Sequence, residues 1–133
     1  MRRAAAAAVV FLACLTVVYA ASAQEGHPLT GTWAGDWGPS AADRTRVTIV
    51  MSWDGKTVSG LIDPGPNAVP IGSVFVDWAT WTVRLEADGK DSSGQPVRIS
   101  AEGRLEDIGS YHRRIVGTWT QGGVKGDLRL TRD

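Results

Sequence analysis

Apolar and polar residues alternate with a period of two along most of the chain after Gln24. This is the period of β-strands, whose successive side chains point to opposite faces, and no stretch after Gln24 carries apolar residues at helical spacing. The alternating runs are separated by turn signals, of which Asp54-Gly55 is the strongest hairpin signal. The pattern therefore predicts an all-β chain of eight short strands. The expected strands are Leu29–Trp37, Thr45–Trp53, Val58–Ile62, Val74–Trp78, Trp81–Ala87, Val97–Leu105, Tyr111–Trp119 and Val124–Leu130.

A second regularity is a five-residue unit, apolar-x-Gly-x-apolar, in which the glycine lies on the apolar face. It occurs at Leu29–Trp33, Val58–Ile62, Ala101–Leu105, Ile115–Trp119 and Val124–Leu128. Glycine weakens a strand interior, so its repeated use on the inward face indicates strands that coil and approach one another closely. The predicted fold class is an antiparallel up-and-down eight-stranded barrel, with a β-sandwich as the alternative.

The first 23 residues have the pattern of a signal peptide. A basic start, Met1-Arg2-Arg3, is followed by an uncharged apolar run and by the small residues Ala21-Ser22-Ala23. This predicts cleavage before Gln24 and a bacterial protein exported to the periplasm or the extracellular space, leaving 24–133 as a single barrel domain. The alternative is an uncleaved anchor, since about 20 apolar residues can span a bilayer.

Cleavage changes the composition of the working chain. It removes Arg2 and Arg3, so 14 basic residues become 12 against 14 acidic ones, and it removes Cys14, the single cysteine. A slightly acidic chain offers no basic field for nucleic acid or for an anionic membrane, and a chain without cysteine has no disulfide framework. Its stability must come from the core, and all six Trp remain to fill it.

The first expected strand carries Gly31-Thr32-Trp33 after a short N-terminal tail. In this the chain resembles the lipocalins and their calycin relatives, whose barrels begin with a G-x-W motif. The resemblance implies that Trp33 plugs the closed end and that a basic residue of the last strand stacks across it; Arg129 and Arg132 lie in that strand, and Arg132 is in better alternation to face inward. The chain departs from lipocalins in being shorter and in lacking a helix after the barrel and a disulfide.

The tryptophans are the first candidates for a binding site. Trp33 and Trp119 are expected in the core, because small barrels need bulky fillers. Trp37, Trp53 and Trp81 lie near strand ends, where the mouth of a barrel is, and indoles there can line a pocket for an apolar or planar ligand. The alternative for these three is also core filling.

Polar candidates are fewer. Asn67 is at the tip of an expected stiff loop, 63–70, which contains three prolines and is interpreted either as a lid over the mouth or as a long turn. Arg113 falls on the inward register, where it either meets a ligand anion or reaches to water.

No catalytic or metal-binding motif is found in the sequence. His27 and His112 are the two histidines, and the acidic turn 88–94 does not have the spacing of a calcium loop. We therefore expect no enzyme activity, no metal and no cofactor.

Three functions remain open. The first is a binding protein that holds a small hydrophobic or amphipathic ligand in a Trp-lined barrel. The second is a surface-acting interaction protein, such as a protease-inhibitor-like barrel with Gln24–Leu29 as the inserting tail. The third is a carbohydrate-binding sandwich with exposed indoles.

Overall fold

The computed structural model describes residues 26–133, so the predicted signal peptide, 1–23, lies outside the described residues. Eight strands follow one another along this part of the chain, with no helix among the described residues and hence none that could cross a membrane. They are β1 (Gly31–Gly38), β2 (Thr45–Trp53), β3 (Val58–Ile62), β4 (Val69–Asp77), β5 (Thr82–Lys90), β6 (Pro96–Glu106), β7 (Arg114–Gln121) and β8 (Val124–Arg132).

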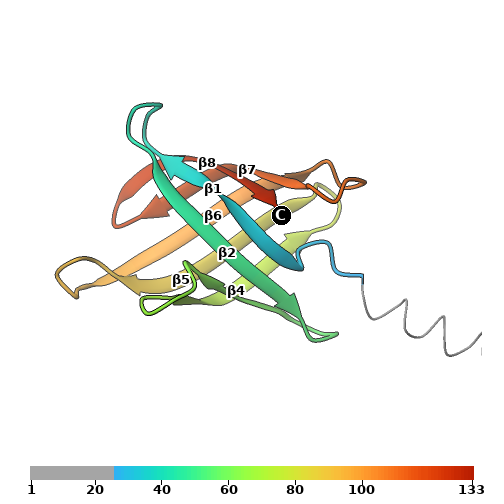
Figure 1. Cartoon of the computed structure of the whole chain (residues 1–133), viewed down its shortest axis with the longest axis horizontal. Helices are drawn as coiled ribbons and strands as arrows, with labels where there is room; N and C mark the ends of the chain where they lie inside the picture. Colours follow the sequence, from blue (N-terminus) through green and yellow to red (C-terminus); the bar gives the residue numbers. More distant parts are fainter. Residues whose placement is uncertain (1–25) are drawn as a thin grey trace, which may run out of the picture.

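The strands form one closed antiparallel barrel in which each strand pairs with its neighbours in sequence and β1 pairs with β8 (Figure 1). The closing seam runs from Trp33 opposite Arg132 to Gly38 opposite Asp127. This confirms the predicted fold class and shows that the sandwich alternative is wrong, since the eight strands form a single closed sheet. The architecture is consistent with a lipocalin-like fold.

Antiparallel connections place alternate turns at opposite ends of the barrel. We call one the plugged end, which carries the N-terminal segment Gly26–Thr30 and the connections 54–57, 78–81 and 107–113. The other, the loop end, carries the connections 39–44, 63–68, 91–95 and 122–123. In Figure 1 the chain enters at the plugged end, on the right.

The barrel interior is filled by apolar side chains from every strand, and among the described residues no polar or charged side chain is buried with them. Alternation explains this, because every second residue of a strand points inward. Trp33 and Trp119 are the largest fully buried side chains of this core, at 0% and 1% exposure. The other buried residues are Leu29, Trp37, Val47, Ile49, Met51, Ile62, Val83, Leu85, Ala87, Ile99, Ala101, Leu105, Ile115, Leu128 and Leu130.

Two strands begin three or more residues away from their predicted starts. β4 begins at Val69, so the stiff loop ends at Ala68, and Val69 and Ile71 pack against the core from a strand rather than forming a lid. β7 begins only at Arg114, which leaves Tyr111 and Arg113 in the preceding connection.

Candidate functional site

The weakest seam of the barrel wall lies between β3 and β4. Within the described chain these strands pair only through Leu61 with Pro70 and Ile62 with Val69, next to the loop end. Pro70 has no N–H to donate, and a bulge between Ile71 and Ser73 shifts the register of β4 against β5. Toward the plugged end, residues 58–60 of β3 therefore form no backbone pair with residues 71–77 of β4.

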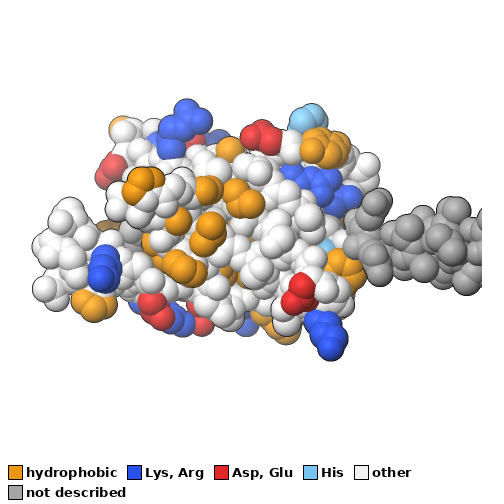
Figure 2. All heavy atoms as spheres, turned by 60° about the horizontal axis from the view of Figure 1, so that its bottom comes forward, with side chains coloured by type: hydrophobic (Ala, Val, Ile, Leu, Met, Phe, Trp, Pro, Cys, Tyr) orange, Lys and Arg blue, Asp and Glu red, His pale blue; other side chains and the backbone are white. Residues whose placement is uncertain are grey.

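The two strands diverge into a surface cleft of about 730 Å³, which we call the β3–β4 cleft. Its apolar walls are half-buried side chains that also pack on the core: Val58, Ile71, Val74 and Val76. Figure 2 turns the lower side of Figure 1, which carries β4, toward the viewer; hydrophobic side chains gather near the middle of this face and charged ones lie toward its margins. The cleft thus gives a ligand access to apolar surface without opening the filled interior.

Aromatic rings form the rim of the cleft at the plugged end. His27 lies between two indoles, with ring centroids 5.6 Å from Trp53 and 5.7 Å from Trp78. Trp78 in turn meets Trp81 edge to face at 5.5 Å. We call these four residues the aromatic rim; three of them line the cleft, and Trp81 supports Trp78 from outside it. Trp78 is 52% exposed, so its ring offers free surface at the entrance.

Trp81 has a left-handed backbone, with φ of +56°, which is rare for a bulky residue. A conformation of this kind costs on the order of 1–3 kcal/mol and must be held by its surroundings. Here the Leu105 N–H donates to the Trp81 carbonyl at 2.8 Å, and the indole packs on Trp78. The turn thereby fixes the position of the aromatic rim.

The N-terminal segment holds His27 in the rim. Leu29 is fully buried, and its carbonyl accepts a hydrogen bond from the Trp33 indole N–H at 2.8 Å. The Leu29 N–H donates to His27 Nδ1 at 3.2 Å, and the Thr30 N–H donates to the His27 carbonyl at the same distance. The described part of the expected projecting tail therefore lies against the barrel.

Burial lowers the pKa of the His27 imidazole below its ordinary value. Because Nδ1 accepts the Leu29 N–H, the folded state also holds that nitrogen without a proton. The unfolded chain then binds more protons than the folded one, so the stability from this residue is complete above about pH 6.5 and is lost as the pH falls below that value.

We therefore expect the free energy of unfolding to fall between pH 7.5 and pH 5.5, measured by urea denaturation. His27→Asn, whose amide oxygen can accept the same N–H, should reduce this fall. The carboxyl groups with lowered pKa values, Asp54, Asp91 and Asp127, titrate below this range, so they do not contribute to the change in stability between pH 7.5 and pH 5.5. Equal pH dependence in both proteins would show that His27 is not responsible.

The structure separates the three tryptophans expected at one mouth. Trp53 and Trp81 both lie at the plugged end, linked through His27 and Trp78, whereas Trp37 lies toward the loop end, where it is buried and stacks on Trp119 at 5.9 Å. Asn67 is exposed at the loop end, beside a separate hollow between the connections 63–68 and 91–95. Neither Trp37 nor Asn67 therefore contributes to the β3–β4 cleft.

The two candidate arginines hold the plugged end together. Arg113 donates to the carbonyls of Ile108 at 2.8 Å and Pro28 at 3.1 Å, and its pKa is lowered by burial and by the nearby charge of Arg132. The Arg132 guanidinium lies over the ring of Tyr111, 4.9 Å from its centroid, where the resemblance implied Trp33. Arg132 also donates to the carbonyls of Tyr111 and Thr30. Both side chains are thus engaged by the chain itself.

Sequence reasoning assigned neither His27 nor Trp78 to a site: His27 fell within the expected tail Gln24–Leu29, and Trp78 was the last residue of the expected strand Val74–Trp78. It also gave no reason to link Val58 with Val74 and Val76. Within residues 26–133, no three His, Cys, Asp or Glu side chains gather closely enough to hold a metal ion.

Comparison with known proteins gives no relative to guide the assignment: no family model, no curated protein and no solved structure matches this chain.

Proposed function

We propose that this protein is an exported binding protein that holds a small amphipathic ligand in the β3–β4 cleft. The observation that supports this best is the divergence of β3 and β4, which exposes apolar core side chains beneath an aromatic rim. Burying apolar area contributes about 25 cal/mol per Å², so a ligand with an apolar body gains most where such surface is already gathered and shaped.

The charge at the cleft indicates which polar group the ligand carries. Among the described residues that line it, Lys56 is the only one with a full charge at neutral pH, and no carboxylate is among them. Lys56 lies in the β2–β3 turn at the edge of the cleft. The ligand that fits has an apolar body on Val58, Val74 and the rim indoles, and an anionic head near Lys56.

Export and location belong to the same proposal. The signal pattern of 1–23 supports release of the barrel into the periplasm or the extracellular space. N-terminal sequencing of the protein from its own host should find Gln24 as the first residue. A chain that still begins at Met1 would contradict export with cleavage.

The binding test uses dansyl-labelled undecanoic acid and its methyl ester as probes, with energy transfer from the tryptophans to the dansyl group as the signal. Trp78→Ala should weaken binding of both probes about tenfold, because the exposed indole forms part of the entrance. Lys56→Met should weaken binding of the acid about two- to fivefold, as expected for an exposed ion pair, and leave the ester unchanged.

Matched controls are available on the same barrel. Tyr111→Ala removes another exposed ring at the plugged end, and Lys90→Met removes a lysine beside the hollow of the loop end. Both should bind the acid as the unmodified protein does. Loss of binding in Lys90→Met but not in Lys56→Met would move the site to the loop end and overturn the proposal.

A further inference from the structure

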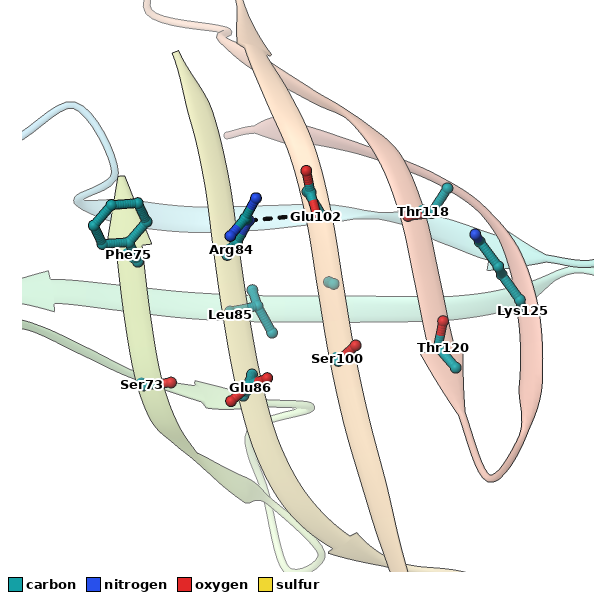
Figure 3. A pocket seen from close by; sticks show the side chains of 11 residues that line it. Ser73, Phe75, Arg84, Leu85, Glu86, Ser100, Glu102, Thr118, Thr120 and Lys125 are labelled. Atoms are coloured by element: carbon teal, nitrogen blue, oxygen red, sulfur yellow. Dashed lines mark ion pairs between the residues drawn. The ribbon is translucent and has the colours of Figure 1, made fainter. Parts of the chain in front are cut away.

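A second hollow lies on the outer face of the barrel across β4 to β8; it adjoins the β3–β4 cleft, with which it shares Ser73 and Phe75, and is lined by none of the rim indoles. Two rows of cross-strand neighbours run side by side from β4 to β8, a width of about 19 Å at ordinary strand spacing. One row is Phe75, Arg84, Glu102, Thr118 and Asp127, and the other is Ser73, Glu86, Ser100, Thr120 and Lys125. We call the hollow between and over them the outer groove; its volume is about 520 Å³ (Figure 3).

The floor of the outer groove is made of short hydroxyl side chains. Ser100 and Thr120 are directly paired on β6 and β7, and longer side chains, Glu86 and Lys125, stand on either side of them (Figure 3). Across the described chain, no side-chain hydrogen bond involves the hydroxyls of Ser73, Ser100, Thr118 or Thr120. These groups can therefore both donate to and accept from a ligand.

Phe75 gives the groove one apolar surface. Its ring is 59% exposed at the β4 side. A single exposed aromatic residue is common, but this one lies where the outer groove meets both the β3–β4 cleft and a smaller hollow of about 180 Å³ lined by Asp77, Thr80 and Thr82. Polar positions thus lie on both sides of a flat apolar ring.

The charges of the groove balance. The lining holds two basic residues, Arg84 and Lys125, and two acidic ones, Glu86 and Glu102, while Asp127 of the first row is paired with Arg44 outside the groove. Arg84 Nε lies 3.4 Å from Glu102 Oε2. A balanced surface does not attract a nucleic acid, which requires excess positive charge. A hydroxyl floor likewise offers little to a purely apolar partner. The matching chemistry is an uncharged molecule rich in hydroxyls that also has an apolar face.

We propose that the outer groove binds an uncharged oligosaccharide. One sugar ring stacks its C–H face on Phe75, and the hydroxyls of this ring and its neighbours bond to Arg84, Glu102 and the hydroxyl floor. The groove crosses several strands, so a chain of sugars fits it better than one. Phe75 and Ser73 also line the β3–β4 cleft, whereas the polar residues of β5, β6 and β7 that bond to the sugar do not.

The test is titration of the ¹⁵N-labelled protein, expressed from the full chain, with four neutral hexasaccharides: cellohexaose, chitohexaose, maltohexaose and mannohexaose. At least one should shift the backbone amide signals of Arg84, Ser100 and Thr118. Phe75→Ala should weaken its binding about tenfold or more. Ser100→Arg, which fills the floor from an outward-facing position, should abolish binding while leaving the dansyl-acid affinity unchanged.

Tyr111→Ala serves as the control, because it removes an equally exposed ring outside the groove and should bind the hexasaccharide normally. The proposal is overturned if none of the four sugars shifts the groove amides, or if the shifts centre on Val58 and Val74 of the cleft. It is also overturned if Phe75→Ala binds as tightly as the unmodified protein. The ligand of the cleft is measured with a different probe, and Ser100→Arg separates the two sites because Ser100 lines the groove and not the cleft.

Discussion

Gly117→Ala is expected to lower the free energy of unfolding by about 3 kcal/mol or more, or to prevent folding. Gly117 of β7 is paired with Gly103 of β6, and a Cβ at position 117 would overlap the Glu102 carbonyl oxygen and the Gly103 Cα. Both are backbone atoms of β6, which is paired with β5 and with β7, so they cannot move aside without disrupting the backbone hydrogen bonds between these strands. Urea denaturation followed by circular dichroism measures the effect.

Gly109→Ala is the matched control for this substitution. Gly109 lies in the connection between β6 and β7, and a Cβ there would meet no atom within 4 Å. Its stability should change by less than about 0.5 kcal/mol, or rise slightly because alanine restricts the unfolded chain. If both alanine variants were equally stable, close approach of β6 and β7 would not be the reason for glycine at position 117.

The parts of the fold that the sequence predicts well are those decided by neighbours in the chain. The β2–β3 hairpin has the expected bounds because Asp54 and Gly55 form its turn locally. The Asp54 carboxylate accepts the N–H groups of Lys56 and Thr57, each at 2.8 Å, and Gly55 has a φ of +98°. The glycines on apolar faces likewise predict close strand approach, which the pairing of Gly103 with Gly117 shows.

The start of β4 was mispredicted because a bulge changes the parity of the strand. Val69 and Ile71 are odd-numbered core-facing positions, whereas Val74 and Val76 are even-numbered ones, and the shift falls between Ile71 and Ser73. A period-two pattern read from the C-terminal half of the strand therefore stops at Val74. The prolines then made the remainder look like a loop.

Part of the candidate site can be predicted from the end of the barrel at which each strand begins and finishes. In an up-and-down barrel the end of β2, the end of β4 and the start of β5 lie at the same end, so Trp53, Trp78 and Trp81 must lie at that end too. By the same rule Trp37, at the end of β1, must lie at the opposite end. The cleft itself could not be predicted, because the length of the β3–β4 seam depends on a long-range register that no local pattern encodes.

The packing of the N-terminal segment Gly26–Thr30 at the plugged end could not be predicted either, because it depends on contacts between residues distant in the sequence. Arg113 reaches back 85 positions to the Pro28 carbonyl, and Arg132 reaches the Thr30 carbonyl. With Leu29 buried beneath them, these contacts order the segment that carries His27. The Trp33 indole N–H also bonds to the Leu29 carbonyl of this segment, so the position of the aromatic rim depends on Trp33 as well.

Trp33→Ala should lower the free energy of unfolding by about 3–5 kcal/mol, because it leaves a large cavity where the side chain is fully buried. Trp33→Phe keeps most of the apolar volume but leaves the Leu29 carbonyl without its donor, at a cost of about 1–3 kcal/mol. With that bond lost, the His27 segment should pack less firmly. The dependence of stability on pH between 5.5 and 7.5 should then shrink as well.

Trp119→Phe separates this coupling from the general cost of losing an indole. Trp119 is as deeply buried, but its N–H donates to Gln121 at 3.0 Å and its ring stacks on Trp37, toward the loop end. We expect Trp119→Phe to lose stability comparably while keeping the full pH dependence. If Trp33→Phe also kept it, the indole N–H of Trp33 would not be what holds His27 between Trp53 and Trp78, and the rim would be ordered by the arginine contacts alone.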